Sequence, residues 1–153
     1  MKFEEVLGDF SEKTGLGRLG TDADGSVGLM FDNQHEIFFT PDAVDESLLV
    51  YCEIADAGRL EKDELLRLMK ASLLGAETGG ASFGIHEGLK KIVLWKRFNN
   101  SFESVSDLEK KINTFLAQVI YWKEHIGERS ADREIHAESE NSDSGFNFSA
   151  MSV

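Results

Sequence analysis

Three segments of the sequence carry residue types that could do chemistry, and the first resembles the nucleophile motif of serine hydrolases. Gly80, Ser82 and Gly84 match G-x-S-x-G, in which a strand delivers the serine to a sharp turn and a helix follows. Here the hydrophobic spacing predicts the reverse order, a helix before the serine and a strand after it. We assign no catalytic residue and keep a small hydrolase that uses Ser82 only as a remote alternative.

The second segment, Gly15, Gly17 and Gly20, matches the dinucleotide-binding pattern G-x-G-x-x-G. That pattern binds pyrophosphate because a strand feeds the glycine turn and the following helix directs its N-terminal amides at the phosphates. In this sequence a predicted helix precedes the glycines and a predicted strand follows them. The pattern therefore predicts no nucleotide site, and we expect no cofactor.

The third segment is an acidic turn that resembles part of a calcium-binding loop. Aligning Gly25 with the invariant glycine of that loop puts Gly20 and Phe31 where the loop needs its two anchoring carboxylates. Asp22 and Asp24 are then better explained as turn residues. The histidines have no cysteine or histidine partner at metal-ligand spacing, so we predict no metal site. They are His35, His86, His125 and His136.

The composition is that of one folded, water-soluble domain. The chain has 153 residues, of which 41% are hydrophobic and 29% charged, and its formal net charge is −12. A field of that sign repels phosphate backbones and anionic lipid headgroups, which argues against nucleic acid and membrane partners. No stretch approaches the roughly 20 apolar residues of a spanning helix, and residues 1–10 lack the features of a signal peptide. The single cysteine, Cys52, in an apolar run also favours the cytoplasm.

Hydrophobic spacing in the first half of the chain predicts a helix and then three strands. The helix has an apolar stripe at i, i+3, i+4 and i+7. The first hairpin alternates at period two, and residues 48–54 form the third strand. The stripe and the alternating hairpin positions are Phe3, Val6, Leu7, Phe10, Val27, Leu29, Phe31, Ile37 and Phe39.

The second half predicts a second helix ending near Gly75, a second hairpin and a long third helix. Ser106 and Glu109 match a capping box ahead of that last helix, whose apolar stripe ends at Ile126. The fold class is therefore α+β, in the order α-β-β-β-α-β-β-α, with an antiparallel twisted sheet and three helices.

The composition changes at Gly127. Residues 127–153 are rich in Ser, Glu, Asp and Asn and poor in large apolar residues, so they cannot bury enough surface to offset the entropy of ordering. We therefore predict one domain over residues 1–126 and a disordered acidic tail over residues 127–153.

This order of elements, with the acidic charge, resembles the class I type III secretion chaperones, the Tir-chaperone family. The segments that carry the resemblance are residues 3–10 with 16–19, 28–32 with 37–39, 65–74, 92–95 and 104–122. The resemblance implies a small homodimer in the bacterial cytoplasm, working without ATP. Its partner would be a secreted effector, whose N-terminal chaperone-binding segment is held extended. The resemblance also admits the secretion ATPase as a partner.

Two surfaces follow from the resemblance, and the surplus of aromatic side chains supports the first. An effector-binding surface is expected on the first helix and first hairpin, at Val6, Phe10, Leu29, Phe31, Ile37 and Phe39. A dimer interface is expected at Leu65, Leu68, Met69, Leu73, Phe83 and Ile85. Because alternation offers the same hairpin side chains to the core, some of the first set will prove structural.

One alternative from a different class stays open. A bacterial protein of the same fold could serve as an adaptor or regulator outside secretion, and the sequence alone does not separate the two. A neighbouring effector or secretion-apparatus gene would favour the chaperone.

Overall fold

The computed structural model describes residues 1–15 and 18–139. Its elements are α1 (Phe3–Thr14), β1 (Arg18–Thr21), β2 (Val27–Phe31), β3 (His35–Asp42), β4 (Ser47–Asp56), the 3₁₀ turn η1 (Ala57–Arg59), α2 (Lys62–Ser72), the 3₁₀ turn η2 (Leu73–Gly75), β5 (Ser82–His86), β6 (Lys91–Asn99) and α3 (Val105–Ser139). This confirms the predicted α+β class and the order of its elements. One strand, β1, is additional to the prediction.

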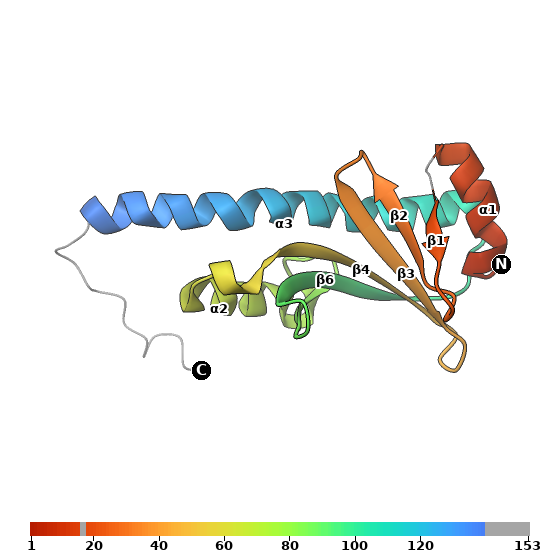
Figure 1. Ribbon diagram of the computed structural model, residues 1–153, viewed down its shortest axis with the longest axis horizontal. Coiled ribbons are helices and arrows are strands. Elements are labelled where there is room, and N and C mark those ends of the chain that lie inside the picture. Colours follow the sequence, from red (N-terminus) through yellow and green to blue (C-terminus); the bar gives the residue numbers. More distant parts are fainter. Residues whose placement is uncertain (16–17, 140–153) are drawn as a thin grey trace.

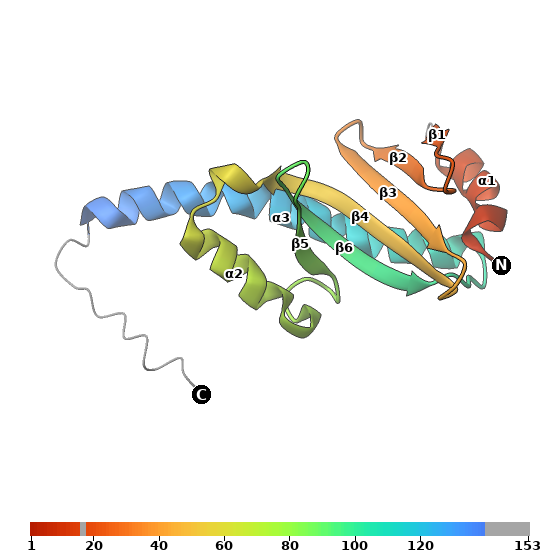
Figure 2. The same ribbon diagram turned by 60° about the horizontal axis from the view of Figure 1, so that its bottom comes forward.

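The strands form one antiparallel sheet in the order β1-β2-β3-β4-β6-β5. The long helix α3 crosses one face of this sheet, and α1 packs beside the start of α3 (Figure 1). We call the face toward α1 and α3 the inner face and the opposite one the outer face. Figure 2 turns the outer face forward, so that α3 passes behind the sheet.

The core lies between the inner face and the apolar stripes of α1 and α3. Phe3 of α1 stacks on Phe39 of β3 with ring centroids 5.1 Å apart, and α3 contributes Phe115 and Trp122. Each large side chain buried in this way contributes roughly 1.5–3 kcal/mol relative to exposure. The buried strand residues of the inner face are Val27, Leu29, Phe31, Ile37, Phe39, Leu48, Val50, Cys52, Ile92 and Leu94.

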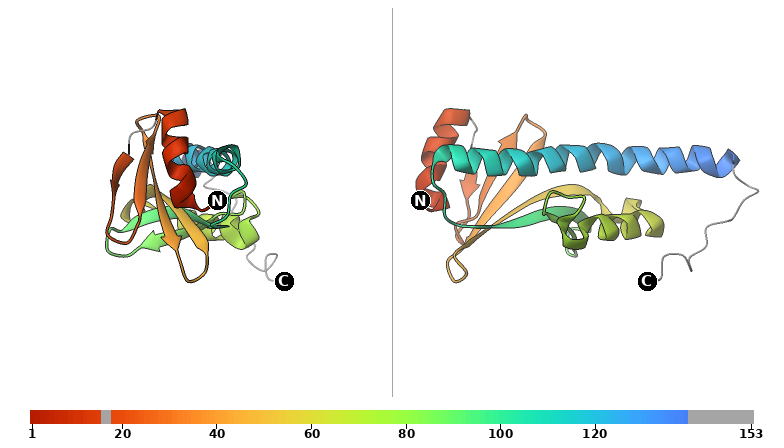
Figure 3. Two further views of the ribbon diagram at one scale, coloured as in Figure 1. Left: turned by 90° about the vertical axis from the view of Figure 1, so that its right-hand side faces the viewer. Right: turned by 180° about the vertical axis from the view of Figure 1, so that it is seen from behind.

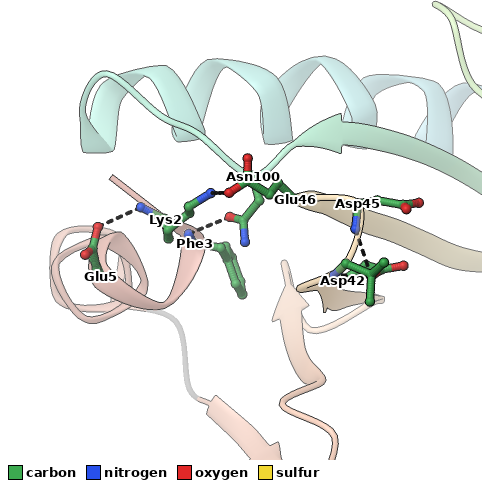
Figure 4. Close-up of polar contacts among 8 residues, drawn as sticks. Lys2, Phe3, Glu5, Asp42, Asp45, Glu46 and Asn100 are labelled. Carbon is green, nitrogen blue, oxygen red and sulfur yellow. Dashed lines mark hydrogen bonds and ion pairs between the residues drawn. The ribbon is translucent and has the colours of Figure 1, made fainter.

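The N-terminus of α1 is tied to the connection between β6 and α3 (Figure 4). The buried side chain of Asn100 accepts a hydrogen bond of 2.7 Å from the Phe3 amide, an amide that α1 itself leaves without a partner. Lys2 forms an ion pair of 3.3 Å with Glu46, and Met1 and Phe102 exchange backbone hydrogen bonds. These contacts fix α1 against the sheet although its residues lie about a hundred positions away in sequence from Asn100.

Helix α2 ends in a sharp turn that brings the chain back to β5. Leu74 in η2 has φ +55°, a left-handed conformation that is rare for a bulky residue. The next residue, Gly75, has φ +68°, and a Cβ there would lie 2.4 Å from the Gly80 Cα. Gly75 is therefore required by close backbone approach. The turn also covers part of the β5 edge, because Ser72 Oγ accepts a 2.8 Å hydrogen bond from the Phe83 amide.

Helix α3 begins with a cap two residues earlier than the sequence predicts. The Ser104 side chain accepts a 3.2 Å hydrogen bond from the Asp107 amide, and the Asp107 carboxylate accepts one from the Glu103 amide. Ser104 therefore caps the helix rather than Ser106, and the Asp107 carboxylate reaches back to the amide just before the cap. At its other end α3 continues to Ser139 and projects beyond the sheet (Figure 3).

The division of the chain at Gly127 stays a prediction. Helix α3 passes that boundary, so the helical residues 127–139 differ from the disorder expected there, and residues 140–153 lie outside the described part. Ile126 is the last apolar residue of the α3 stripe, and it is buried.

Removing the residues after Arg129 with a stop codon is therefore expected to leave the melting temperature nearly unchanged, because the removed segment carries little apolar surface to bury. A thermal melt followed by circular dichroism checks this. A drop of more than a few degrees would contradict it and would mean that Phe146 and Phe148 dock on the domain.

Candidate functional site

The structure corrects the predicted effector-binding surface. All six residues of that set belong to the core and are at most 7% exposed. A polypeptide seated on the molecule would not reach them, because α1 and α3 cover them on the inner face. The residues are Val6, Phe10, Leu29, Phe31, Ile37 and Phe39.

The outer face carries a row of aromatic side chains that no described helix covers. The register pairs Phe38 of β3 with Tyr51 of β4, and Tyr51 with Trp95 of β6, so the three lie side by side across the sheet. Phe38 and Tyr51 stack with centroids 5.1 Å apart, and Trp95 is exposed. We call Phe38, Tyr51 and Trp95 the aromatic row. Apolar side chains exposed together in this way are typical of a binding surface.

A groove extends from the Trp95 end of the aromatic row toward β5. Its wall is mostly apolar and comes from three strands, β4, β5 and β6. The lining residues are Leu49, Tyr51, Gly84, Ile85, His86, Val93, Trp95 and Arg97.

Carboxylates border the row alongside Phe38 and Tyr51. Burial raises the pKa of the Tyr51 hydroxyl, and the negative charges of Asp24, Glu53, Asp22 and Glu36 raise it further. The aromatic surface is therefore bordered by acidic side chains from β3, β4 and the turn before β2. Negative potential next to exposed rings favours a partner that brings positive charge.

A second exposed apolar surface lies on α2 and the turn that follows it. Met69, Leu73 and Leu74 are 70%, 69% and 97% exposed. Ile85 of β5 is 60% exposed. We call these four residues the α2 surface. Of the predicted dimer residues it includes Met69, Leu73 and Ile85.

The other predicted dimer residues have a different place in the structure. Leu68 is buried, and Leu65 and Phe83 are partly buried against the core. Leu66, Leu89 and Trp95 are further exposed apolar residues between α2 and β6 that the sequence did not single out. Helical spacing found the α2 stripe, and two of its four residues, Met69 and Leu73, stay uncovered in the single chain.

The motifs with catalytic or metal-binding patterns do not assemble into sites. Ser82 and His86 lie on the same strand, about 13 Å apart along it. His86 accepts a hydrogen bond from the Leu89 amide instead. Burial raises the pKa of the Cys52 thiol to about 11, which disfavours the reactive thiolate.

The described residues contain no group of three or more metal-ligating side chains. Within the same part of the chain, no helix has the length and apolar character needed to cross a membrane.

A sheet with helices on one face, an open aromatic row on the other and a separate apolar helix surface defines a polypeptide-binding protein. The comparison with known families makes this specific. The profile of the Tir chaperone protein (CesT) family matches residues 5–123, and the chain belongs to that family. The predicted resemblance is thereby confirmed, and the family is one of chaperones rather than enzymes. No curated protein sequence matches the chain.

Solved structures share the fold. The HopA1–SchA chaperone–effector complex contains a chain with a TM-score of 0.64 and 22% identity, covering 80% of this chain and 93% of that one. The Yersinia pestis type III secretion chaperone SycH, solved with a fragment of YscM2, gives 0.59 and 15%, covering 78% and 98%. YbjN of E. coli, a putative transcription regulator, gives 0.53 and 15%, covering 84% and 92%.

Proposed function

We propose that this protein is a cytoplasmic type III secretion chaperone. It binds the N-terminal chaperone-binding segment of a secreted effector in extended form, without ATP, and keeps that effector soluble and competent for secretion. Membership of the chaperone family supports this function, and so does the fold shared with chains solved as secretion chaperones bound to their partners.

The observation that carries the proposal is the aromatic row on the uncovered outer face. An extended segment binds through backbone hydrogen bonds and through alternate side chains that enter apolar pockets. The outer face offers the exposed Trp95 ring, the half-buried rings of Phe38 and Tyr51, and the adjoining apolar groove. Strand β1 lies at the end of the sheet order and has β2 as its one described neighbour, so it offers a second place for backbone pairing. This mode of binding requires no acid, base or metal.

The active form in this proposal is a homodimer joined through the α2 surface. The α2 surface exposes four large apolar side chains. Exposed apolar area of this kind is typical of a protein–protein interface. Two copies related by a twofold axis would cover each other's α2 surface while leaving the aromatic row free for the effector.

A regulator or adaptor outside secretion is the second candidate. The likeness to YbjN supports it, because a chain described as a putative transcription regulator has the same fold. The family match favours the chaperone. If the protein is a secretion chaperone, the secretion ATPase is a further partner. Binding of a secreted effector is the observation that distinguishes the chaperone from the adaptor.

The test is to purify the wild-type protein and the Phe38→Ala variant from the native cell and to identify the proteins that co-purify with each. We expect wild type to retain a secreted protein. The variant should lose at least about tenfold of it with only a small change in melting temperature, because Phe38 lies on the outer face and contributes mainly the stack with Tyr51.

Phe39→Ala is the matched control, one residue further along the same strand. Phe39 is fully buried, so its truncation should cost about 3–5 kcal/mol of folding stability. If Phe38→Ala retains the partner at the wild-type level, the outer face is not the binding surface. If wild type carries a regulator and no secreted protein, the adaptor function replaces the chaperone.

A further inference from the structure

We infer that the acidic border of the aromatic row, formed by Glu36 beside Phe38 and Glu53 beside Tyr51, selects a lysine or arginine side chain within the bound segment. The inference rests on the proposed function, because it assigns the chemistry of one residue in the segment that the outer face would hold. The occupant is an extended polypeptide whose basic residue lies over the rings of Phe38 and Tyr51. Its charge then faces Glu36 and Glu53.

The first argument is that Glu36 and Glu53 face each other without a cation. Ile37 pairs with Cys52, so Glu36, just before Ile37, and Glu53, just after Cys52, lie at the same level of neighbouring strands. Neither side-chain carboxylate has an ion pair or hydrogen bond with another residue of the described part of the chain. Like charges directly opposite each other destabilise a sheet. A bound cation would relieve this repulsion.

The second argument is that the basic side chains next to this surface are already paired. Arg97 donates a 2.7 Å hydrogen bond to the Ser47 hydroxyl and pairs with Asp45 at 3.4 Å. Lys91 pairs with Asp56 at 2.6 Å. Among the described residues, Arg97 and Lys91 are thus held by other partners, which leaves the Glu36 and Glu53 carboxylates to attract charge from outside.

The third argument is that rings and carboxylates occur together. The register places Phe38 opposite Gly28 and Tyr51, so no side chain stands directly opposite the ring on β2. A lysine or arginine can lay its aliphatic stem on such rings and keep its charged head at the acidic border. Positive charge over an aromatic face is itself favourable. An aliphatic residue would gain the ring contact alone, which is why the surface distinguishes basic segments from purely apolar ones.

The test uses a displayed library of random 12-residue peptides, selected against the immobilised full-length wild-type protein and against the double variant Glu36→Gln/Glu53→Gln. We expect peptides selected by wild type to be enriched in Lys or Arg flanked by apolar residues. Their Kd should weaken roughly tenfold for the double variant and on raising the salt concentration to 1 M. The melting temperature of the free variant should stay the same or rise, because the repulsion is gone.

Glu12→Gln/Glu124→Gln is the matched control, since it changes the net charge equally at exposed helix positions away from the outer face; it should leave the Kd within about twofold. Selected peptides without basic enrichment, bound equally by both proteins, would overturn the inference and leave the proposed function standing. Selection of no peptide at all would count against the proposed function itself. A change of oligomeric state in the Glu36→Gln/Glu53→Gln variant would place a second copy on this face and also overturn the inference.

Discussion

Leu73→Glu is expected to convert the proposed dimer into a monomer. Leu73 is 69% exposed in the single chain and lies at the centre of the α2 surface, between Met69 and Leu74. In a dimer it would be buried on both sides of the twofold axis, so the substitution would place two uncompensated carboxylates in an apolar interface. We expect a loss of at least about 3 kcal/mol of association free energy, a weakening of roughly a hundredfold or more. Analytical ultracentrifugation at micromolar concentration measures it.

Val44→Glu is the matched control for the charge change. Val44 is 92% exposed in the turn between β3 and β4, away from α2, and its substitution should leave the association unchanged. If wild type sediments as a monomer at tens of micromolar, or if Leu73→Glu remains a dimer, the α2 surface is not the interface.

Leu74 gives an independent reason to expect a partner there. A leucine in the left-handed region is strained by about 1 kcal/mol or more, and its side chain is 97% exposed in the single chain. The turn serves the return of the chain to β5, but the single chain does not bury the Leu74 side chain, whereas a dimer would bury it. Glycine would adopt the same backbone conformation without strain. A leucine at position 74 is therefore best explained by a contact that its side chain makes with a partner.

The sequence predicted correctly which strand residues share the inner face of the sheet, but it placed the binding surface on the wrong face. Both outcomes have one physical reason. Alternation at period two identifies which residues share a face, but it does not say which face the helices cover. Phe38 and Phe39 are adjacent and equally apolar, yet Phe39 packs on Phe3 and Phe38 lies on the outer face. Phe38, which lies between the predicted contact residues Ile37 and Phe39, was thus the better candidate.

Elements with weak periodicity escaped prediction for a different reason. Strand β1 is only four residues long and pairs irregularly with β2, so it contains too little alternation to recognise. The cap of α3 was predicted at Ser106, and the helix begins instead with a cap at Ser104. Helical spacing found the α2 stripe, but exposure of Met69 depends on what covers α2, and no local pattern encodes that.

Arg67→Met is expected to destabilise the fold strongly, because it leaves a buried carboxylate unpaired. Glu64 and Arg67 lie one turn apart on α2, with side chains 3% and 17% exposed. The Arg67 guanidinium donates two hydrogen bonds to the Glu64 carboxylate and lies 5.5 Å from the ring centre of Trp122 on α3. Through this contact the pair also holds α2 against α3. Removing one partner of a buried ion pair costs about 3–5 kcal/mol.

Urea denaturation at fixed protein concentration measures the loss, and two further variants show its origin. Lys111→Met removes the cation of a partly exposed i,i+4 pair with Asp107 and should cost no more than about 1 kcal/mol. Glu64→Leu/Arg67→Met removes both charges and should recover most of the stability, since apolar replacement of a buried pair is often neutral or favourable. If Arg67→Met costs less than about 1 kcal/mol, Glu64 is hydrated in solution and the pair does not fix α2. If Arg67→Met is costly and the double variant is no better, the loss comes from the stack on Trp122 rather than from the unpaired charge.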